Sequence, residues 1–183
     1  MVAGLSLYLG IGSHGEKGTG IALVGGPFSL TDQTGRRVTD KDFLGKYMLV
    51  IFGYTYCPDV CPTELQVMSA ALDQLGTKAD SIQPLFITID PQRDTPEVLK
   101  QYVSNFHPRL VGLTGTADEI ASVAKAYRVY YSKVENNAGP DNYLMDHSTI
   151  IYLMDRQGRF LKHFTYTTDA PAFAQALGQA IIP

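Results

Sequence analysis

The sequence predicts an α/β domain built on a parallel sheet. Strand-like and helix-like segments alternate along most of the chain, which implies right-handed crossovers between parallel strands. The run "YMLVIFGY" (Tyr47 to Tyr54) is apolar throughout, a pattern typical of a central strand buried on both faces. The 183 residues are 45% hydrophobic and include 17 Gly and 10 Pro, an ordinary composition for one folded domain.

The first 21 residues differ in character from the rest of the chain. "VAGLSLYLGIG" (Val2 to Gly12) is apolar but shorter than the roughly 20 residues that a spanning helix needs, and no basic segment precedes it. "SHGEKGTG" (Ser13 to Gly20) has the composition of a flexible linker. We expect residues 1–21 to be a leader and linker, either the remnant of a membrane anchor or a disordered start. Residues 22–183 are expected to form the folded domain.

The first elements are a hairpin, a buried strand and a helix. "FSLTDQTGRRVT" (Phe28 to Thr39) predicts a hairpin that turns at Asp32 to Gly35. The buried strand 47–54 follows. "PTELQVMSAALDQL" (Pro62 to Leu75) has apolar residues at helical spacing, and Pro62 suits the first helical position. The helix is therefore predicted to begin at Pro62, with Cys61 as its N-cap.

Two further strand–helix units come next. They are the strand "PLFITID" (Pro84 to Asp90), the helix "TPEVLKQYVSNF" (Thr95 to Phe106), the strand "RLVGLTG" (Arg109 to Gly115) and the helix "TADEIASVAKAYRV" (Thr116 to Val129). Thr95 is the expected N-cap of the first of these helices, because Pro96 follows it.

The C-terminal third predicts an antiparallel ending. "YYSKVE" (Tyr130 to Glu135) is a strand candidate, and a polar loop over residues 136–147 follows it. "STIIYLMD" (Ser148 to Asp155) turns through "DRQG" into "RFLKHFTY", and a last helix starts near residues 168–171. A βαβ unit, a second crossover and a closing ββα predict a thioredoxin-like fold, here with an extra N-terminal β-hairpin.

The charge of the chain excludes one class of partner. The formal net charge is -3, and no run of lysine or arginine occurs. We therefore expect no nucleic-acid partner.

The chain has two cysteines, Cys57 and Cys61, each followed by proline. A disulfide between them would close a very small loop and so remove little entropy from the unfolded chain, which argues against a purely structural role. Their place after a buried strand and at a helix start favours thiolates, because the positive end of the helix dipole lowers a thiol pKa. Two chemistries remain open, namely thiol–disulfide exchange and binding of a soft ion such as Cu(I). A structural zinc site would ordinarily need four ligands.

A third ligand is sought among four histidines. His14 lies in the linker, His107 in a turn that ends a helix, and His163 in the C-terminal strand. His147 stands directly before an apolar strand, at the end of the polar loop. On spacing alone, all four are expected to be structural or solvated.

Three segments in order, "GYTYCPDVCPTEL", "ITIDPQRDTPEVL" and "DHSTIIYLMD", closely resemble the SCO/SenC family of copper chaperones for cytochrome c oxidase assembly. The resemblance extends from about Gly25 to Ile182. It implies a thioredoxin-like fold with an inserted hairpin and an N-terminal membrane helix. It also implies a location on the periplasmic side of a bacterial inner membrane, or in the mitochondrial intermembrane space.

The resemblance also implies the site. By position, the copper ligands are Cys57, Cys61 and His147, holding Cu(I) and also able to accept Cu(II). The implied partners are the oxidase subunit that carries the CuA centre and a thiol reductant or copper donor protein. Two departures are a tyrosine, Tyr56, before the first cysteine, where histidine or phenylalanine is also expected, and an apolar leader too short to be the full membrane helix.

Three polar or soft residues near these motifs have open roles. Asp90 ends a predicted strand, so it either supports the site from behind the ligands or only starts a turn. Asp94 or Thr95 is expected to cap the next helix. Met145, two residues before His147, is expected to pack on the domain rather than to bind copper.

Two functions from different classes follow. The first is a metallochaperone that delivers copper to the CuA site. The second is a thiol–disulfide oxidoreductase that reduces the cysteines of that site, with Cys57 as nucleophile and Cys61 as resolving thiol. Whether the chain is an enzyme stays open at this point. His147 distinguishes the two, because a copper site needs it and a redox catalyst does not.

Overall fold

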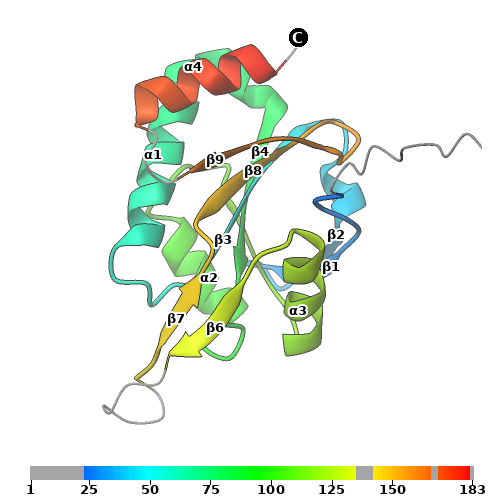
Figure 1. Cartoon of the computed structure of the whole chain (residues 1–183), viewed down its shortest axis with the longest axis vertical. Coiled ribbons are helices and arrows are strands. Elements are labelled where there is room, and N and C mark those ends of the chain that lie inside the picture. Colours follow the sequence, from blue (N-terminus) through cyan, green and yellow to red (C-terminus); the bar gives the residue numbers. More distant parts are fainter. Residues whose placement is uncertain (1–22, 135–141, 166–168, 182–183) are drawn as a thin grey trace, which may run out of the picture.

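The computed structural model describes residues 23–134, 142–165 and 169–181 (Figure 1). Its main sheet has seven strands in the order β2-β1-β5-β4-β3-β8-β9. They are β1 (Ser29–Asp32), β2 (Arg37–Thr39), β3 (Tyr47–Gly53), β4 (Ile82–Thr88), β5 (Val111–Thr114), β8 (Ile150–Met154) and β9 (Phe160–Thr165).

The predicted parallel core is confirmed. β3 pairs in parallel with β4, and β4 with β5. β8 then pairs antiparallel with β3, and β9 with β8. All seven residues of β3 are buried, because both faces of the sheet are covered.

Helices lie on both faces of the sheet. Three of them, α1 (Val60–Leu75), α2 (Pro96–Val103) and α4 (Ala170–Ala180), pack on the face that carries Leu49 and Ile51. The helix α3 (Ala117–Ala126) packs on the other face, against Val50 and Phe52 (Figure 1). Two short 3-10 helices, η1 (Asp40–Phe43) and η2 (Gly76–Ser81), complete the helices of the described residues. None of the helices within the described ranges has the length and apolar character needed to cross a bilayer.

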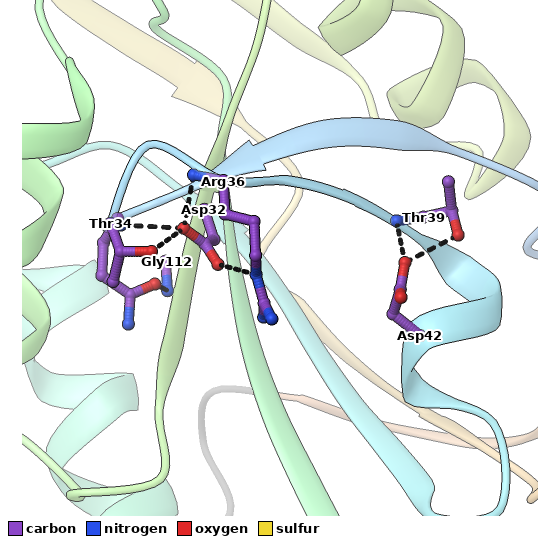
Figure 2. A network of polar contacts seen from close by, with 7 residues as sticks. Asp32, Thr34, Arg36, Thr39, Asp42 and Gly112 are labelled. Carbon is purple, nitrogen blue, oxygen red and sulfur yellow. Dashed lines mark hydrogen bonds and ion pairs between the residues drawn. The ribbon is translucent and has the colours of Figure 1, made fainter.

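The N-terminal strands β1 and β2 pair antiparallel, and an aspartate organises their turn. The Asp32 carboxylate accepts hydrogen bonds from the Thr34 backbone N–H (2.8 Å), the Thr34 hydroxyl (2.6 Å) and the Arg36 backbone N–H (3.1 Å) (Figure 2). Gly35, with φ of 83°, takes the left-handed conformation that this turn requires. β1 then joins the sheet beside β5.

A second, two-stranded sheet corrects the end of the polar loop predicted over residues 136–147, because residues 144–147 form a strand, while residues 136–141 lie outside the described ranges. β6 (Tyr131–Val134) pairs antiparallel with β7 (Leu144–His147), and His147 lies opposite Tyr131. Residues along β7 alternate between exposed and half-buried, so the strand carries no apolar run that the sequence could reveal. This β6–β7 hairpin extends beyond the end of the main sheet, at the bottom of the view in Figure 1.

The start of α1 also differs from the prediction. The helix begins at Val60, with Asp59 as N-cap, so Cys61 lies inside its first turn instead of capping it. Pro62 is tolerated there because the first N–H groups of a helix have no intrahelical acceptor. The backbone N–H of Thr63 donates to the Asp59 carbonyl (3.2 Å), which closes the first turn around Cys61 and Pro62.

Candidate metal centre

Three side chains from three different segments meet at the end of β3. Cys57 comes from the loop between β3 and α1, Cys61 from the first turn of α1, and His147 from the end of β7. One ligand atom of each lies within 4.8 Å of the other two, so the group could hold a metal ion. Cys61 is buried and the other two are half-buried, so the group is open to solvent on one side.

The loop that carries Cys57 is fixed by a buried carboxylate. Asp94, which is fully buried, accepts hydrogen bonds from the backbone N–H of Thr55 (3.1 Å) and from the hydroxyl groups of Thr55 and Thr88. The N–H of Cys57 donates to the Tyr54 carbonyl (3.2 Å), which forms a tight turn. Asp94 therefore ties the loop to the end of β4, and the helix cap expected nearby is Thr95 alone, whose hydroxyl accepts from Val98.

A glycine makes room for the buried sulfur. A Cβ atom added to Gly53 would lie 2.9 Å from the Cys61 Sγ and 2.9 Å from Cε2 of Phe86. No side chain larger than hydrogen fits at the end of β3 while Cys61 keeps its position. Gly53 was not predicted from the sequence, although a glycine that ends a fully apolar strand directly before a cysteine loop is a signal of close approach.

The pKa values of the two thiols are shifted in opposite directions. Hydrogen bonding from the Cys61 side chain, together with bonds from His147 and from the Cys61 and Asp59 backbone, lowers the pKa of Cys57 to about 4 despite its partial burial. The Cys61 N–H lies 3.3 Å from the Cys57 Sγ. The same side-chain bond, together with burial, raises the pKa of Cys61. Without metal, the pair is therefore one thiolate, Cys57, and one thiol, Cys61.

The histidine presents a defined nitrogen to the sulfurs. Its Nδ1 lies 3.0 Å from the carbonyl oxygen of Ser148, which can only accept, so Nδ1 carries the proton. In the neutral ring, Nε2 then holds the lone pair, and it lies 3.4 Å from the Cys61 Sγ. Burial alone would lower the pKa of His147, but the hydrogen bonds with Cys57 and Ser148 outweigh it and raise that pKa.

A buried carboxyl lies one turn along α1 from Cys61. Glu64 is 2% exposed, and neither of its oxygens has a hydrogen-bond partner among the described residues. Burial raises the pKa of Glu64 to about 7, an effect that a protonated His147 opposes and the Cys57 thiolate reinforces. The sequence analysis did not single out Glu64, since the first turn of a helix is an ordinary place for an exposed glutamate.

An open cavity of about 410 Å³ leads to the site. It lies between the cysteine loop with the start of α1 on one side and the β6–β7 hairpin on the other. Tyr54 lines its floor and meets the His147 ring edge-on, with 6.0 Å between the ring centroids. A partner thiol or ion can therefore reach Cys57 and His147 from solvent.

The remaining residues considered from the sequence fall outside the group. Met145 lines the cavity and packs against the core on the α3 face, as expected. His107 is buried and its Nδ1 accepts from the Arg109 N–H (3.2 Å), which makes it a turn cap. His163 lies on the edge strand β9, stacked on Phe160. His14 lies outside the described residues.

Asp90 binds neither cysteine nor histidine directly. One oxygen of its carboxylate accepts from the hydroxyl of Tyr143 (2.8 Å), and the other pairs with Arg93. The turn predicted at this position is also present, because the N–H groups of Arg93 and Asp94 donate to the Asp90 carbonyl. The interpretation of Asp90 as the start of a turn is confirmed, and its support of the site stays a prediction.

Comparison with known proteins decides the family. The family model described as SCO1/SenC matches residues 16–181. The chain belongs to the SCO1/SenC family. The human mitochondrial SCO1 homolog is 50% identical over 151 residues, which are 81% of this chain and 50% of that protein. SCO1 of Saccharomyces cerevisiae is 47% identical over 150 residues, 81% of this chain and 51% of that protein. The chain thus spans about half the length of these two curated relatives.

Solved SCO structures share the fold. ScoI of Bradyrhizobium japonicum, solved with copper bound, is 48% identical, with a TM-score of 0.79 over 86% of this chain and 99% of that one. Yeast Sco1 with copper bound is 42% identical, with a TM-score of 0.79 over 87% of this chain and 91% of that one. The expected thioredoxin-like α/β fold is confirmed by these matches. These two solved SCO structures hold copper, and Cys57, Cys61 and His147 of this SCO1/SenC chain form a group that could bind a metal.

Proposed function

We propose that this chain is a copper-binding metallochaperone that delivers copper to the CuA site of cytochrome c oxidase during its assembly. One observation carries the proposal. The sulfurs of Cys57 and Cys61 and the lone pair of His147 Nε2 converge within 4.8 Å, at the mouth of an open cavity. Two soft thiolates and one imidazole suit Cu(I), and three donors leave room for exchange.

The residues have separate tasks in this account. Cys57, already a thiolate and half-exposed, meets the incoming ion first. Cys61 loses its proton as the ion binds, because the metal's charge offsets the burial and the neighbouring thiolate that hold that proton. His147 completes the site through Nε2. Copper passes to the recipient by ligand exchange at Cys57 and His147, which line the cavity.

Low pH is expected to weaken copper binding, and the order of protonation follows from the pKa shifts. His147, whose pKa is raised, gains a proton first as the pH falls, and Cys57, whose pKa is near 4, gains one last. Protonation removes a ligand each time. As the pH is lowered, the copper affinity should therefore begin to fall at a pH above the ordinary histidine pKa of about 6.5.

The location and the tether belong to the same proposal. We place residues 22–183 as the copper-binding domain and residues 1–21 as the link to a membrane anchor. The domain faces the periplasm of a bacterium or the mitochondrial intermembrane space. Relatives among mitochondrial SCO1 proteins and a SCO2-like protein of Rickettsia prowazekii, 44% identical over 141 residues, support either compartment.

The second candidate is a thiol–disulfide oxidoreductase that reduces the cysteines of the oxidase copper site. The pKa contrast favours it: a half-exposed Cys57 thiolate is poised to attack a disulfide, and Cys61 is a buried resolving thiol. In that step the Cys57 sulfur forms a mixed disulfide with one partner sulfur, and the other leaves as a thiolate. Cys61 then displaces the first partner thiol, so the partner gains two electrons and Cys57–Cys61 becomes a disulfide.

Anaerobic titration of the reduced protein with Cu(I) separates these functions. One equivalent should bind tightly, and His147→Ala should weaken binding by about 10-fold or more, because a ligand is lost. His163→Ala, a histidine away from the group, is the matched control and should bind as the wild type does. If binding is weak or indifferent to His147 while exchange with a dithiol partner is fast, the oxidoreductase replaces the chaperone.

A further inference from the structure

A cluster of charged and aromatic side chains contacts both the segment that carries Cys57 and the segment that carries His147. Arg93, in the loop between β4 and α2, has 14% of its side chain exposed and forms an ion pair with Asp90. Its guanidinium carbon lies 3.6 Å from the ring centroid of Tyr143 and 4.5 Å from that of Tyr56. Its Nη1 also donates to the Tyr143 carbonyl (3.0 Å). We call Asp90, Arg93 and Tyr143 the Arg93 clasp.

The two aromatic rings belong to the two ligand-bearing segments. Tyr56 directly precedes Cys57, and Tyr143 directly precedes β7, which ends at His147. Arg93 therefore contacts both segments at once. Fifty residues separate Arg93 from Tyr143 in sequence, so the contact ties together parts of the chain that have no local connection.

The clasp anchors the far end of the hairpin. The base of the hairpin is held by Ser148, whose N–H donates to the Tyr130 carbonyl (3.0 Å) and whose hydroxyl accepts from the Tyr130 N–H (3.2 Å). Tyr143 lies at the opposite end of β7, about 13 Å along the strand from His147 at the usual rise per residue. With both ends fixed, the strand cannot pivot at its base, and the direction of the His147 ring is set.

The loop that carries Arg93 is itself held in place by buried hydrogen bonds. The loop that carries Arg93 is held by Asp94, which is fully buried and bonded to Thr55 and Thr88. The same loop thus fixes the cysteine segment through Asp94 and the histidine segment through Arg93. Within this loop the Arg93 guanidinium faces the Asp90 carboxylate, and Tyr143 donates its hydroxyl to the other Asp90 oxygen (2.8 Å).

We propose that Arg93, held by Asp90, is a positioning residue that sets the place of His147 relative to the two sulfurs and thereby tunes copper affinity. The proposal rests on the copper site proposed above. Arginine suits this place because its planar group stacks on one ring while it donates to a carbonyl and a carboxylate, which lysine cannot do. The Tyr143 side of the clasp leads to His147 alone, whereas Arg93 also contacts Tyr56 beside Cys57. An effect on affinity that disappears with His147 therefore identifies the histidine as the route, which a general loss of stability would not do.

A double-mutant cycle carries that test. Cu(I) affinity is measured by competition with a chromophoric Cu(I) chelator for Arg93→Lys and Tyr143→Phe, each with His147 present and in the His147→Ala background. With His147 present, Arg93→Lys should weaken binding about 10-fold, and Tyr143→Phe by several-fold. In the His147→Ala background, both changes should become less than about 2-fold.

A matched control removes a hydroxyl from the same hairpin. Tyr130→Phe loses the bond from its hydroxyl to Ser132, two residues along the chain, and should leave affinity unchanged. Thermal unfolding of each variant shows that it is folded. The clasp is overturned if Arg93→Lys and Tyr143→Phe do not weaken binding, or weaken it equally without His147. If His147→Ala alone has no effect, the ligand set itself is wrong and the clasp falls with it.

Discussion

At the scale of single residues, the two cysteines show how position sets chemistry. Cys57 precedes α1 and receives hydrogen bonds, whereas Cys61 is enclosed between the helix and the end of β3. The same side-chain bond lowers the pKa of one and raises that of the other. In the metal-free protein the cysteine pair therefore carries one negative charge, instead of two charges that would repel each other.

Alkylation reports this asymmetry. Iodoacetamide at pH 6 should modify Cys57 and leave Cys61 unmodified, because the thiolate is the reactive form and Cys61 is both protonated and buried. The rate should fall only as the pH drops through about 4, the pKa of Cys57. In Cys61→Ala, which lacks the bond, the midpoint should move upward. A wild-type midpoint near the ordinary thiol pKa of about 8.5 would refute the assignment.

Glu64 is expected to lower stability above neutral pH. Its pKa is near 7 in the folded protein and about 4.3 in an unfolded chain. The folded state therefore binds the proton more tightly, so the free energy of unfolding falls as the pH rises from about 4.3 through about 7, and is level above that. Glu64→Gln removes the charge, and should stabilise the metal-free protein at pH 8 by up to about 3 kcal/mol and not at pH 4. Denaturant unfolding at both pH values measures this, and equal effects at the two would contradict it.

At the scale of elements, the end of β3 is shaped to admit the Cys61 sulfur. Gly53→Ala places a methyl group 2.9 Å from that sulfur and from Phe86. We expect a loss of about 1–3 kcal/mol in stability, as for other overpacked sites, and weaker Cu(I) binding because the sulfur must move. Gly26→Ala is the control, since its added Cβ would meet only Ala126 at 3.5 Å. Unchanged binding and stability in Gly53→Ala would show that the strand end is looser than the geometry indicates.

Helices and strands with a strong local sequence pattern could be predicted, and those that depend on contacts remote in sequence could not. The buried run of β3 and the Thr95 cap of α2 follow from local rules, and the structure confirms them. β7 escaped notice because its stability comes from pairing with β6 and from contacts such as Tyr143 with Asp90, which are remote in sequence. The predicted start of α1 was wrong by two residues. Residues before proline are biased against helix, but Pro62 lies in the first turn, where its missing N–H costs no intrahelical hydrogen bond.

The same reasoning explains what could be foreseen of the site. Cys57 and Cys61 were evident as a pair from spacing and from the strand before them. Spacing alone did not distinguish His147 from the other histidines as a metal ligand, and only the family resemblance did. The physical reason lies in topology, since β8 runs antiparallel beside β3 and brings the residues before it to the carboxyl end of β3.

At the scale of the whole molecule, copper should stabilise the fold. The three ligand residues are held by β3, α1 and the β6–β7 hairpin, so an ion that binds all three opposes their separation. At free Cu(I) 100 times the dissociation constant, the gain is about 2.7 kcal/mol. For a chain of this size, that should raise the Tm of the reduced protein by roughly 5–10 °C. A protein with its cysteines oxidised to a disulfide should show no such rise, and an equal rise there would mean that copper binds elsewhere.

The account depends most on the claim that one copper ion lies between Cys57, Cys61 and His147. X-ray absorption spectroscopy of the protein loaded with one equivalent of Cu(I) tests it most directly. The account predicts two sulfur neighbours and one imidazole nitrogen, with the nitrogen contribution lost in His147→Ala. A spectrum with sulfur neighbours alone, or one in which the imidazole signal persists in His147→Ala, would contradict it.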